Sequence, residues 1–439
     1  MRTLMRRGAY VALSAALLLG STACDIDDLL EVENPDIVTP DGLTGPTGLA
    51  TLRAGAIGDF AEAYAGDAGA DEGQVLISGM MADEYIHSGT FNTRREFDRR
   101  DVEDDNGTAT DAFSALQRAR QGLETAAGRI DAANDTDERI GELLGMAGFT
   151  YVMFGENYCS GVPFSNLDES GNLVPGQPRT TTEIFNLAVE RFDAASAEAA
   201  GNADYANLAA LGKGRALLNL GQFSEAAAAV ASVPTDFRFD LTYSVPNQEN
   251  GIFVFNVSVE RWSLANNEGE NGLPFRDLND PRVPFERSPA DDLGFDEVSA
   301  QYDMLKYPTR DANANLATGE EARLIEAEAA LQQGDVDTML EKINEVRAIY
   351  GLDPVTDPGS AEAREDLLFQ ERALTLFATS HRLGDLRRLI RQYGRTANEV
   401  FPVGTYHKDF PDYAGDVNFP VPFDEENNEN FTGCLSRDA

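Results

Sequence analysis

The chain has 439 residues, with 75 Asp or Glu against 35 Lys or Arg, so its formal net charge at pH 7 is −40. This balance argues against nucleic acid as a partner, because a phosphate backbone needs a basic protein face. It argues equally against attraction to anionic lipid, so attachment to a membrane would have to be covalent.

The N-terminus has the organisation of a secretory signal peptide. Three arginines precede an apolar stretch, residues 10–20, which is too short to span a bilayer. Small residues then lead to Cys24, an arrangement typical of a lipobox, although Ser21 stands where Leu is usual. We predict a signal peptide over residues 1–23 and a lipid anchor with tether over 24–44. Cleavage before an unmodified cysteine is the alternative.

The next part of the chain is helical in pattern. Apolar residues recur at intervals of three and four, which predicts helices over residues 43–64, 111–130, 139–154 and 182–200. The run Thr180-Thr181-Thr182-Glu183 is a capping box, which predicts the start of the last of these helices. We assign residues 45–235 to an N-terminal helical region.

Two helix–turn–helix units have the form of tetratricopeptide hairpins. The first covers residues 208–220 and 225–233, and the second covers 320–333 and 338–349. In each unit a glycine, Gly221 or Gly334, stands where the first helix has to end in a left-handed conformation. The two units are not in tandem, so a simple solenoid is not expected.

Short strands and long loops separate these units. Residues 237–243 and 251–259 have the alternation typical of strands, and Gly-, Asn- and Pro-rich loops follow at 266–289 and in the tail, 397–439. We assign residues 236–439 to a C-terminal region. The predicted fold class is mainly α, with tetratricopeptide-like helical hairpins as a scaffold and a loop-rich region that contains a few short strands. Long loops on such a scaffold usually carry recognition.

No catalytic or metal-binding motif stands out. The three histidines, His87, His381 and His407, lack metal-ligand spacing, and no phosphate-binding loop or nucleophile elbow is present. The adjacent carboxylates Asp83 and Glu84 could belong to a glycosidase pair, but neighbouring acids are common in so acidic a chain. We predict a protein that is not an enzyme and that has no cofactor and no metal.

Short motifs form an ordered set along the mature chain, at residues 30–35, 158–163, 280–282, 306–307, 323–331, 371–372, 381–388 and 419–422. The most specific is Glu371-Arg372 followed by His-Arg-Leu-Gly-Asp-Leu-Arg-Arg over residues 381–388. Taken in this order, the set resembles the SusD/RagB family of nutrient-uptake outer-membrane lipoproteins. The chain departs from the family at 158–163, where Cys-Ser-Gly replaces a shorter glycine turn. The acidic run at 25–28 resembles a surface-export signal, and a solvated charge run is the alternative.

The resemblance implies a lipid-anchored, surface-exposed protein of the outer membrane that works with a SusC-like TonB-dependent transporter. It also implies an oligosaccharide ligand, stacked on aromatic side chains, or a peptide ligand in some members. The candidates for such a platform are Trp262, Tyr85, Phe91 and Tyr302, which come from loop-rich segments. Ordinary core or loop packing is the alternative for each of them.

The segment 371–388 is interpreted as a helix with a structural role. His381 and Asp385 are spaced to share a helix face, as are Asp385 and Arg388, and Leu374, Phe377 and Leu386 supply its apolar stripe. A buried charged network is favoured over a catalytic His–Asp pair, because no nucleophile is near in sequence.

Two cysteines remain once Cys24 is assigned to the lipid anchor. Cys159 and Cys434 form an even pair in an oxidising compartment, so we predict a disulfide between them, with two buried thiols as the alternative. The function predicted from the whole sequence is capture of glycan or other nutrient for a transporter. A periplasmic tetratricopeptide-type scaffold is the second hypothesis, and a secreted glycoside hydrolase is the third.

Overall fold

The computed structural model describes residues 45–68, 71–134, 136–168, 172–199, 201–288, 292–408 and 411–439. The predicted signal peptide, Cys24, the tether and the motif at 30–35 lie outside these residues. The chain divides into two units, Met1–Gly48 and Leu49–Ala439, and the description below concerns the second. Within the described ranges, no helix combines the length and the apolar character needed to cross a bilayer. The division at 235/236 stays a prediction.

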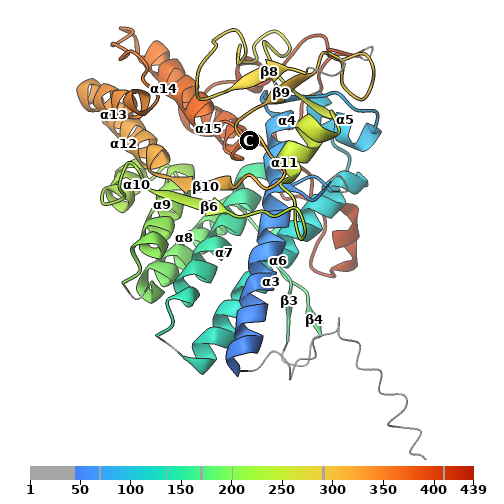
Figure 1. Ribbon diagram of the computed structural model, residues 1–439, viewed down its shortest axis with the longest axis vertical. Coiled ribbons are helices and arrows are strands. Elements are labelled where there is room, and N and C mark those ends of the chain that lie inside the picture. Colours follow the sequence, from blue (N-terminus) through green and yellow to red (C-terminus); the bar gives the residue numbers. More distant parts are fainter. Residues whose placement is uncertain are drawn as a thin grey trace, which may run out of the picture. The chain divides into compact units, whose positions relative to one another are not determined.

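The first half of this unit is an array of helices in which neighbours in sequence pack side by side (Figure 1). Its members are α3 (Gly45–Ala65), α6 (Gly107–Ala133), α7 (Arg139–Asn157), α8 (Thr181–Glu198), α9 (Ala203–Asn219) and α10 (Phe223–Val230). The four helices predicted between residues 43 and 200 are therefore confirmed, with small shifts of their ends. The predicted capping box is also present, since the Thr180 and Glu183 side chains each accept from the other residue's backbone N–H.

Close approach of α7, α8 and α9 depends on glycine. The ring of Phe192, on α8, lies against Gly148 of α7 and Gly212 of α9. A Cβ atom built on Gly148 would stand 2.6 Å from that ring, and one built on Gly212 would stand 2.2 Å from it. The absent side chains are what allow an aromatic ring to fill the space between three helices.

The second set of helices continues the array, because α12 packs against α10 (Figure 1). It comprises α12 (Gly319–Gln333), α13 (Val336–Ile349), α14 (Ala361–Thr375), α15 (Arg382–Tyr393) and the short α16 (Ala397–Val400). Gly334 ends α12 with a φ of +75°, as the hairpin pattern predicted. Both predicted hairpins are present, and α12 with α13 encloses a small core of its own around Leu324 and Ile343.

The single helix predicted over residues 371–388 is wrong, because the chain breaks between α14 and α15. Ala378 and Ser380 both have positive φ, at 57° and 59°. Distant residues form hydrogen bonds with the backbone of this connection. Ala378 donates its N–H to Glu84 Oε1 at 2.9 Å, and Lys306 donates to the Phe377 carbonyl at 2.5 Å. These partners lie far away in sequence, so local periodicity could not reveal the break.

The loop-rich part of the unit holds short elements from three stretches of the chain (Figure 1). They are α4 (Gln74–Met81), β1 (Tyr85–His87), α5 (Asn92–Arg99), β6 (Arg238–Leu241), α11 (Gly251–Phe253), the π-helix η2 (Val254–Ser258), β7 (Trp262–Leu264), β8 (Phe285–Arg287), β9 (Tyr302–Met304) and β10 (Ala314–Thr318). The strands form antiparallel pairs, β1 with β7, β6 with β10, and β8 with β9. Two smaller pairs, β2 (Val162–Pro163) with β5 (Pro178–Arg179) and β3 (Asn166–Leu167) with β4 (Leu173–Val174), follow α7, and η3 (Phe423–Asn427) lies in the tail.

One of the two predicted strands in this part is confirmed, since residues 237–243 contain β6. The strand predicted over 251–259 is wrong, because that segment is α11 followed by η2. Asn250 caps the turn by accepting from the N–H groups of Ile252 and Phe253. The alternating aromatic and β-branched residues misled the prediction, since a single capping side chain decided the local conformation.

The observed architecture confirms the predicted fold class, a mainly α scaffold with a loop-rich region and few short strands. Cys159 and Cys434 are joined by a disulfide, with the sulfur atoms 2.05 Å apart. Their neighbours pair as well, because Cys159 donates its N–H to the Phe419 carbonyl and Ser160 forms a bridge with Ser436. The tail is thereby fastened to the turn that follows α7.

Candidate ligand-binding surface

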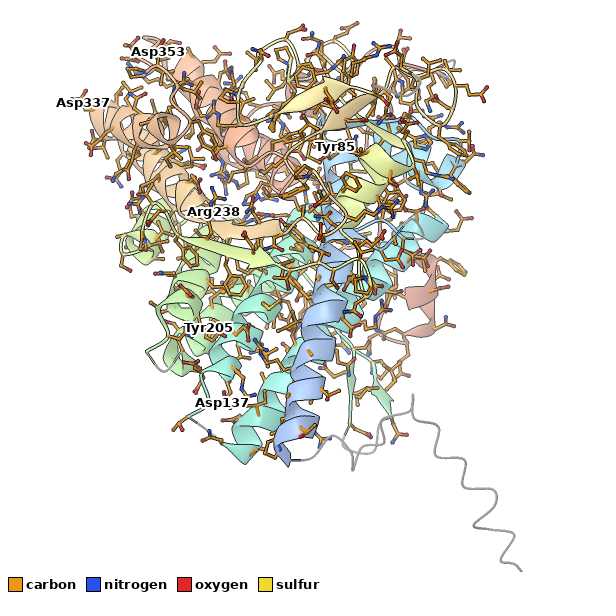
Figure 2. All side chains as sticks on the ribbon, viewed as in Figure 1. Tyr85, Asp137, Tyr205, Arg238, Asp337 and Asp353 are labelled. Carbon is orange, nitrogen blue, oxygen red and sulfur yellow. A yellow bond between two sulfur atoms is a disulfide. The ribbon has the colours of Figure 1, made fainter. Side chains whose placement is uncertain are left out.

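Two of the four aromatic residues proposed from sequence are core residues. Tyr85 and Trp262 lie on the paired strands β1 and β7, and both are fully buried. Their rings meet edge to face, with centroids 6.4 Å apart, and Tyr85 lies in the loop-rich part of the unit (Figure 2). For Tyr85 and Trp262 the structure shows the alternative interpretation, packing in the core. Neither ring offers a face to a ligand.

Phe91 does reach the surface, and it has a partner that the sequence analysis missed. The Phe91 and Phe295 side chains are each 50% exposed. The Arg261 guanidinium carbon lies 4.9 Å from the Phe91 ring centroid and 4.1 Å from that of Phe295. Arg94 stands over Phe91 as well, at 4.6 Å. We call these four residues, Phe91, Arg94, Arg261 and Phe295, the Arg261 surface.

Backbone hydrogen bonds hold the three segments of this surface in place. Ser88 donates its N–H to the Arg261 carbonyl at 3.0 Å, and Phe295 donates to the Glu260 carbonyl at 2.8 Å. Asp296 closes the set by donating to the Ser88 carbonyl at 2.9 Å. The three segments that carry the two rings and the guanidinium group are therefore held together before any ligand arrives, which lowers the entropy cost of binding.

The backbone that leads into Arg261 is unusual. The π-helix η2 ends at Ser258, and Glu260 then has a φ of 51°, which a residue with a side chain rarely adopts. Arg261 donates its N–H back to the Phe255 carbonyl at 2.9 Å, inside the π-helix. Single-turn π-helices and left-handed non-glycine residues are both concentrated at functional sites.

The two arginines of the Arg261 surface differ in their carboxylate partners. Arg94 forms an ion pair with the buried Glu72, whose pKa burial raises to about 7. Arg261 has no carboxylate partner among the residues that the structure describes. Partial burial, followed by the positive charge of Arg94, lowers the pKa of Arg261. One cation of the pair thus has a carboxylate in direct contact, and the other has none among the described residues.

Tyr302, the fourth residue proposed from sequence, is half-buried and already engaged. The Arg276 guanidinium carbon lies 3.6 Å from its ring centroid, and Arg287 donates to its hydroxyl at 3.0 Å. Phe295 and Arg261 were overlooked. Phe295 is a large apolar residue in a loop of Gly, Asp and Glu, which is a usable sign of an exposed aromatic, whereas nothing local distinguishes Arg261.

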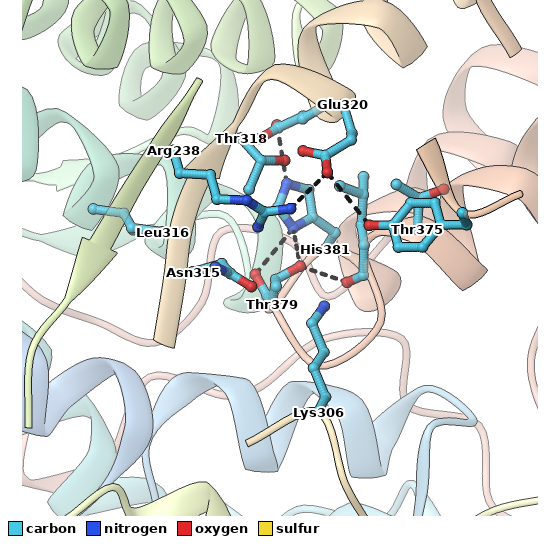
Figure 3. A pocket seen from close by; sticks show the side chains of 12 residues that line it. Arg238, Lys306, Asn315, Leu316, Thr318, Glu320, Thr375, Thr379 and His381 are labelled. Carbon is cyan, nitrogen blue, oxygen red and sulfur yellow. Dashed lines mark hydrogen bonds and ion pairs between the residues drawn. The ribbon is translucent and has the colours of Figure 1, made fainter. Parts of the chain in front are cut away.

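An enclosed polar pocket lies beneath β10, between α12 and the connection from α14 to α15 (Figure 3). Lys306, Glu320, His381 and Arg238 point into it, and Arg238 donates to Glu320 at 2.7 Å. Burial lowers the pKa of Lys306 to about 8. The cavity of about 30 Å³ has room for an ordered water but not for a sugar. Its groups bind the helices to the strand.

The conspicuous charges of residues 83–84 and 371–388 are also internal. Arg382 donates to both oxygens of Asp83, at 2.6 and 2.8 Å, and Asp83 and Glu84 are fully buried. The predicted charged network is confirmed around Asp385, which accepts from Arg372 at 2.8 Å and from Arg388 at 2.7 Å.

The histidine of that motif has a different partner from the one predicted. His381 lies 2.9 Å from Glu321 Oε1 rather than pairing with Asp385. In the described part of the chain, no three His, Cys, Asp or Glu side chains are grouped so as to hold a metal ion.

Comparison with known proteins shows which family and which folds the chain is similar to. Residues 321–431 match the model of the SusD family, whereas no curated protein sequence matches. A SusD-like protein from Bacteroides fragilis NCTC 9343 has a TM-score of 0.65 at 15% identity, covering 91% of this chain and 98% of its own. Surface glycan-binding protein A from Bacteroides uniformis has a TM-score of 0.64 at 12% identity, covering 88% and 99%.

A SusD superfamily protein from Bacteroides vulgatus ATCC 8482 gives a similar result, with a TM-score of 0.62 at 15% identity over 90% of this chain and 99% of its own. At such identities the likeness shows the fold alone. The matched segment contains α13 to α15 and the charged network around Asp385, which includes the most specific of the sequence motifs, Glu371-Arg372 with residues 381–388. Residues 321–431 thus match the SusD family, and the whole described unit shares the fold of SusD-like proteins.

Proposed function

We propose that this protein captures glycans at the Arg261 surface, on the outside of the outer membrane, and delivers them to a SusC-like TonB-dependent transporter. The observation that carries the proposal is the pair of half-exposed rings, Phe91 and Phe295, on either side of a guanidinium group. Apolar sugar faces stack on such rings, and guanidinium N–H groups donate to sugar oxygens. The name of the similar protein from Bacteroides uniformis, a surface glycan-binding protein, supports the same ligand class.

The location and partner in this proposal come from the sequence and the family. Residues 1–24 have the pattern of a lipoprotein signal, and the net charge of −40 leaves a covalent lipid as the plausible membrane link. A SusC-like transporter is the partner that the match to the family suggests. A peptide ligand at the same surface, and a periplasmic scaffold, are the competing functions.

Ligand binding is tested by screening the purified mature protein against glycans and peptides, followed by titration with each hit. Phe91→Ala and Phe295→Ala each remove one ring and are expected to weaken binding by about fivefold, equal to about 1 kcal/mol of stacking. The matched control is Phe423→Ala, which removes a ring that is 53% exposed in η3, away from this surface. Equal losses in all three variants would contradict the proposal, and a hit confined to peptides would favour the alternative ligand.

The partner and location are tested in the source cells. An affinity-tagged chain is expected to co-purify with a large β-barrel protein, and a protease added to intact cells is expected to remove it. Replacement of Cys24 by Ser should release the protein from the membrane fraction. Complete protection from the protease, with no barrel recovered, would favour the periplasmic scaffold.

A further inference from the structure

We propose that the Arg261 surface is selective for sugars that carry a carboxylate, with Arg261 binding the carboxylate while Phe91 and Phe295 contact the apolar face of the sugar. This inference rests on the proposed function, glycan capture at that surface, and names the class of glycan. Uronic acid units have the two required features, a ring with an apolar face and a planar anionic group attached to it.

The first argument is the isolation of the Arg261 charge. Acidic residues outnumber basic ones by 75 to 35, and arginines elsewhere in the described chain commonly have a carboxylate within 4 Å. At Arg261 no described acid is that close, and its Nη1 nitrogen has no acceptor. An arginine without an opposite charge nearby gains charge-assisted hydrogen bonds when an anionic ligand binds it.

The second argument is the neighbouring cation. The guanidinium groups of Arg94 and Arg261 approach the same ring, at 4.6 and 4.9 Å from the Phe91 centroid. Their repulsion contributes to the lowered pKa of Arg261. Glu72 forms its ion pair with Arg94 and acts on Arg261 only from farther away, and burial raises the pKa of Glu72 to about 7, so this compensation is partial near neutral pH. A carboxylate beside Phe91 would relieve the repulsion, and a neutral sugar would not.

The third argument is geometric. A guanidinium group is flat, and the Phe91 and Phe295 rings contact it through their faces. Its donors then remain in the plane, which is the direction from which a carboxylate accepts two parallel hydrogen bonds. Contact with the two rings does not neutralise the group, so its charge stays available to an anionic ligand.

The negative charge of the whole protein limits the length of the ligand. A chain of net charge −40 repels a long polyanion, but at about 0.15 M salt such repulsion is screened beyond roughly 8 Å. A short oligosaccharide that places one carboxylate on Arg261 makes a local contact that screening affects much less. The selectivity is therefore expected for short oligouronides.

The test compares short oligouronides, prepared from polygalacturonate and from alginate, with the same oligosaccharides after chemical reduction of their carboxylates to alcohols. Calorimetric titration of the mature protein at physiological salt is expected to show at least about tenfold tighter binding of one acidic form, equal to about 1.4 kcal/mol. Arg261→Gln should abolish the difference between the acidic and reduced forms. Arg261→Lys should retain part of it, because the charge stays while the planar fork is lost.

Arg129→Gln is the matched control, since Arg129 is an exposed arginine on α6, and it should keep the full difference. Unchanged melting temperatures of the variants establish that they are folded. Equal binding of acidic and reduced forms, or a preference that survives Arg261→Gln, would overturn the inference. If only neutral glycans bind, and binding depends on Phe91 and Phe295, the inference falls while the proposed function stands. If no glycan binds, both fall.

Discussion

The Asp385 network of the helical scaffold and the Arg261 surface of the loop-rich region treat charge in opposite ways. In the scaffold, Asp385 accepts from Arg372 and Arg388, and Arg388 also donates to Glu328, so each charge has an opposite partner. In the loop-rich region, Arg261 has no acidic partner among the described residues, and the left-handed φ values of Glu260 and Asp292 strain the chain nearby.

The contrast indicates that the scaffold gives structural support, and it fits the proposal that the loop-rich region binds the ligand. Paired charges inside the scaffold fix one arrangement of α12, α14 and α15, which a binding surface needs beneath it. Unpaired charge and strained backbone are costly, and they persist where the surrounding structure supports them and a ligand gives them a use. The predictions below test this contrast, first in the scaffold, then between the two regions, and finally at the surface.

The largest effect is expected from breaking the scaffold network. Asp385→Ala leaves Arg372 and Arg388 buried without this partner, which should lower the free energy of unfolding by roughly 3–5 kcal/mol. Chemical denaturation of the mature protein measures it. Asp193→Ala removes an exposed partner of Lys213 and should cost less than about 1 kcal/mol. Similar losses in both variants would show that the Asp385 network contributes no more to the free energy of unfolding than an exposed ion pair does.

A pH-dependent effect is expected where the two regions meet. Burial raises the pKa of Glu84 from 4.5 to about 8, despite the hydrogen bond from Ala378 and the charges of Arg382 and Lys306. The folded state therefore holds a proton that the unfolded chain loses, so this contribution is complete below pH 4.5 and is lost as pH rises toward 8. Glu84→Gln mimics the protonated form. Its melting temperature, relative to the native protein, should rise between pH 5 and 8, and parallel curves would refute the prediction.

A smaller loss is expected from filling the glycine contacts of the scaffold. Gly212→Ala drives a Cβ atom into the Phe192 ring and should cost about 1–3 kcal/mol, after allowance for the helix propensity that alanine adds. Gly128→Ala lies inside α6, where nothing stands within 4 Å, and should stabilise the protein by about 0.5–1 kcal/mol. The test is whether the free energy of unfolding falls in Gly212→Ala and rises in Gly128→Ala, as measured by denaturation under the same conditions.

The same contrast explains which parts of the fold the sequence predicted. Scaffold helices follow from apolar periodicity, and their ends follow from local signals such as the Thr180 capping box and Gly334. The break between α14 and α15 depends on Glu84 and Lys306, which lie far away in sequence. Helix α11 depends on one cap, Asn250, that overrode an alternating pattern. Sequence reasoning failed where long-range contacts or a single side chain decided the outcome.

The candidate surface was harder to predict than the fold. Loop-rich segments and the family resemblance directed attention to four aromatic residues, and of these Phe91 has a half-exposed ring, although its role as a ligand platform stays a prediction. Trp262 was proposed because it stands at the edge of a loop-rich segment, but it lies in the β1–β7 pair and is completely buried. Arg261 becomes notable only once Phe91 and Phe295, from two distant segments, are seen to lie beside it.

The smallest effect on stability is expected at the Arg261 surface itself. Phe295→Ala removes a half-exposed ring, so the free energy of unfolding should change by no more than about 0.5 kcal/mol. Trp262→Ala, one residue from Arg261, empties a fully buried site and should cost roughly 3–5 kcal/mol. The two variants thus distinguish a residue that stabilises the fold from one that contacts the ligand. Phe295→Ala should weaken ligand binding in a protein of native stability, whereas Trp262→Ala should lower the melting temperature. A large loss of stability in Phe295→Ala would mean that the Phe295 ring packs as a core residue, and the surface would lose one of its two stacking faces.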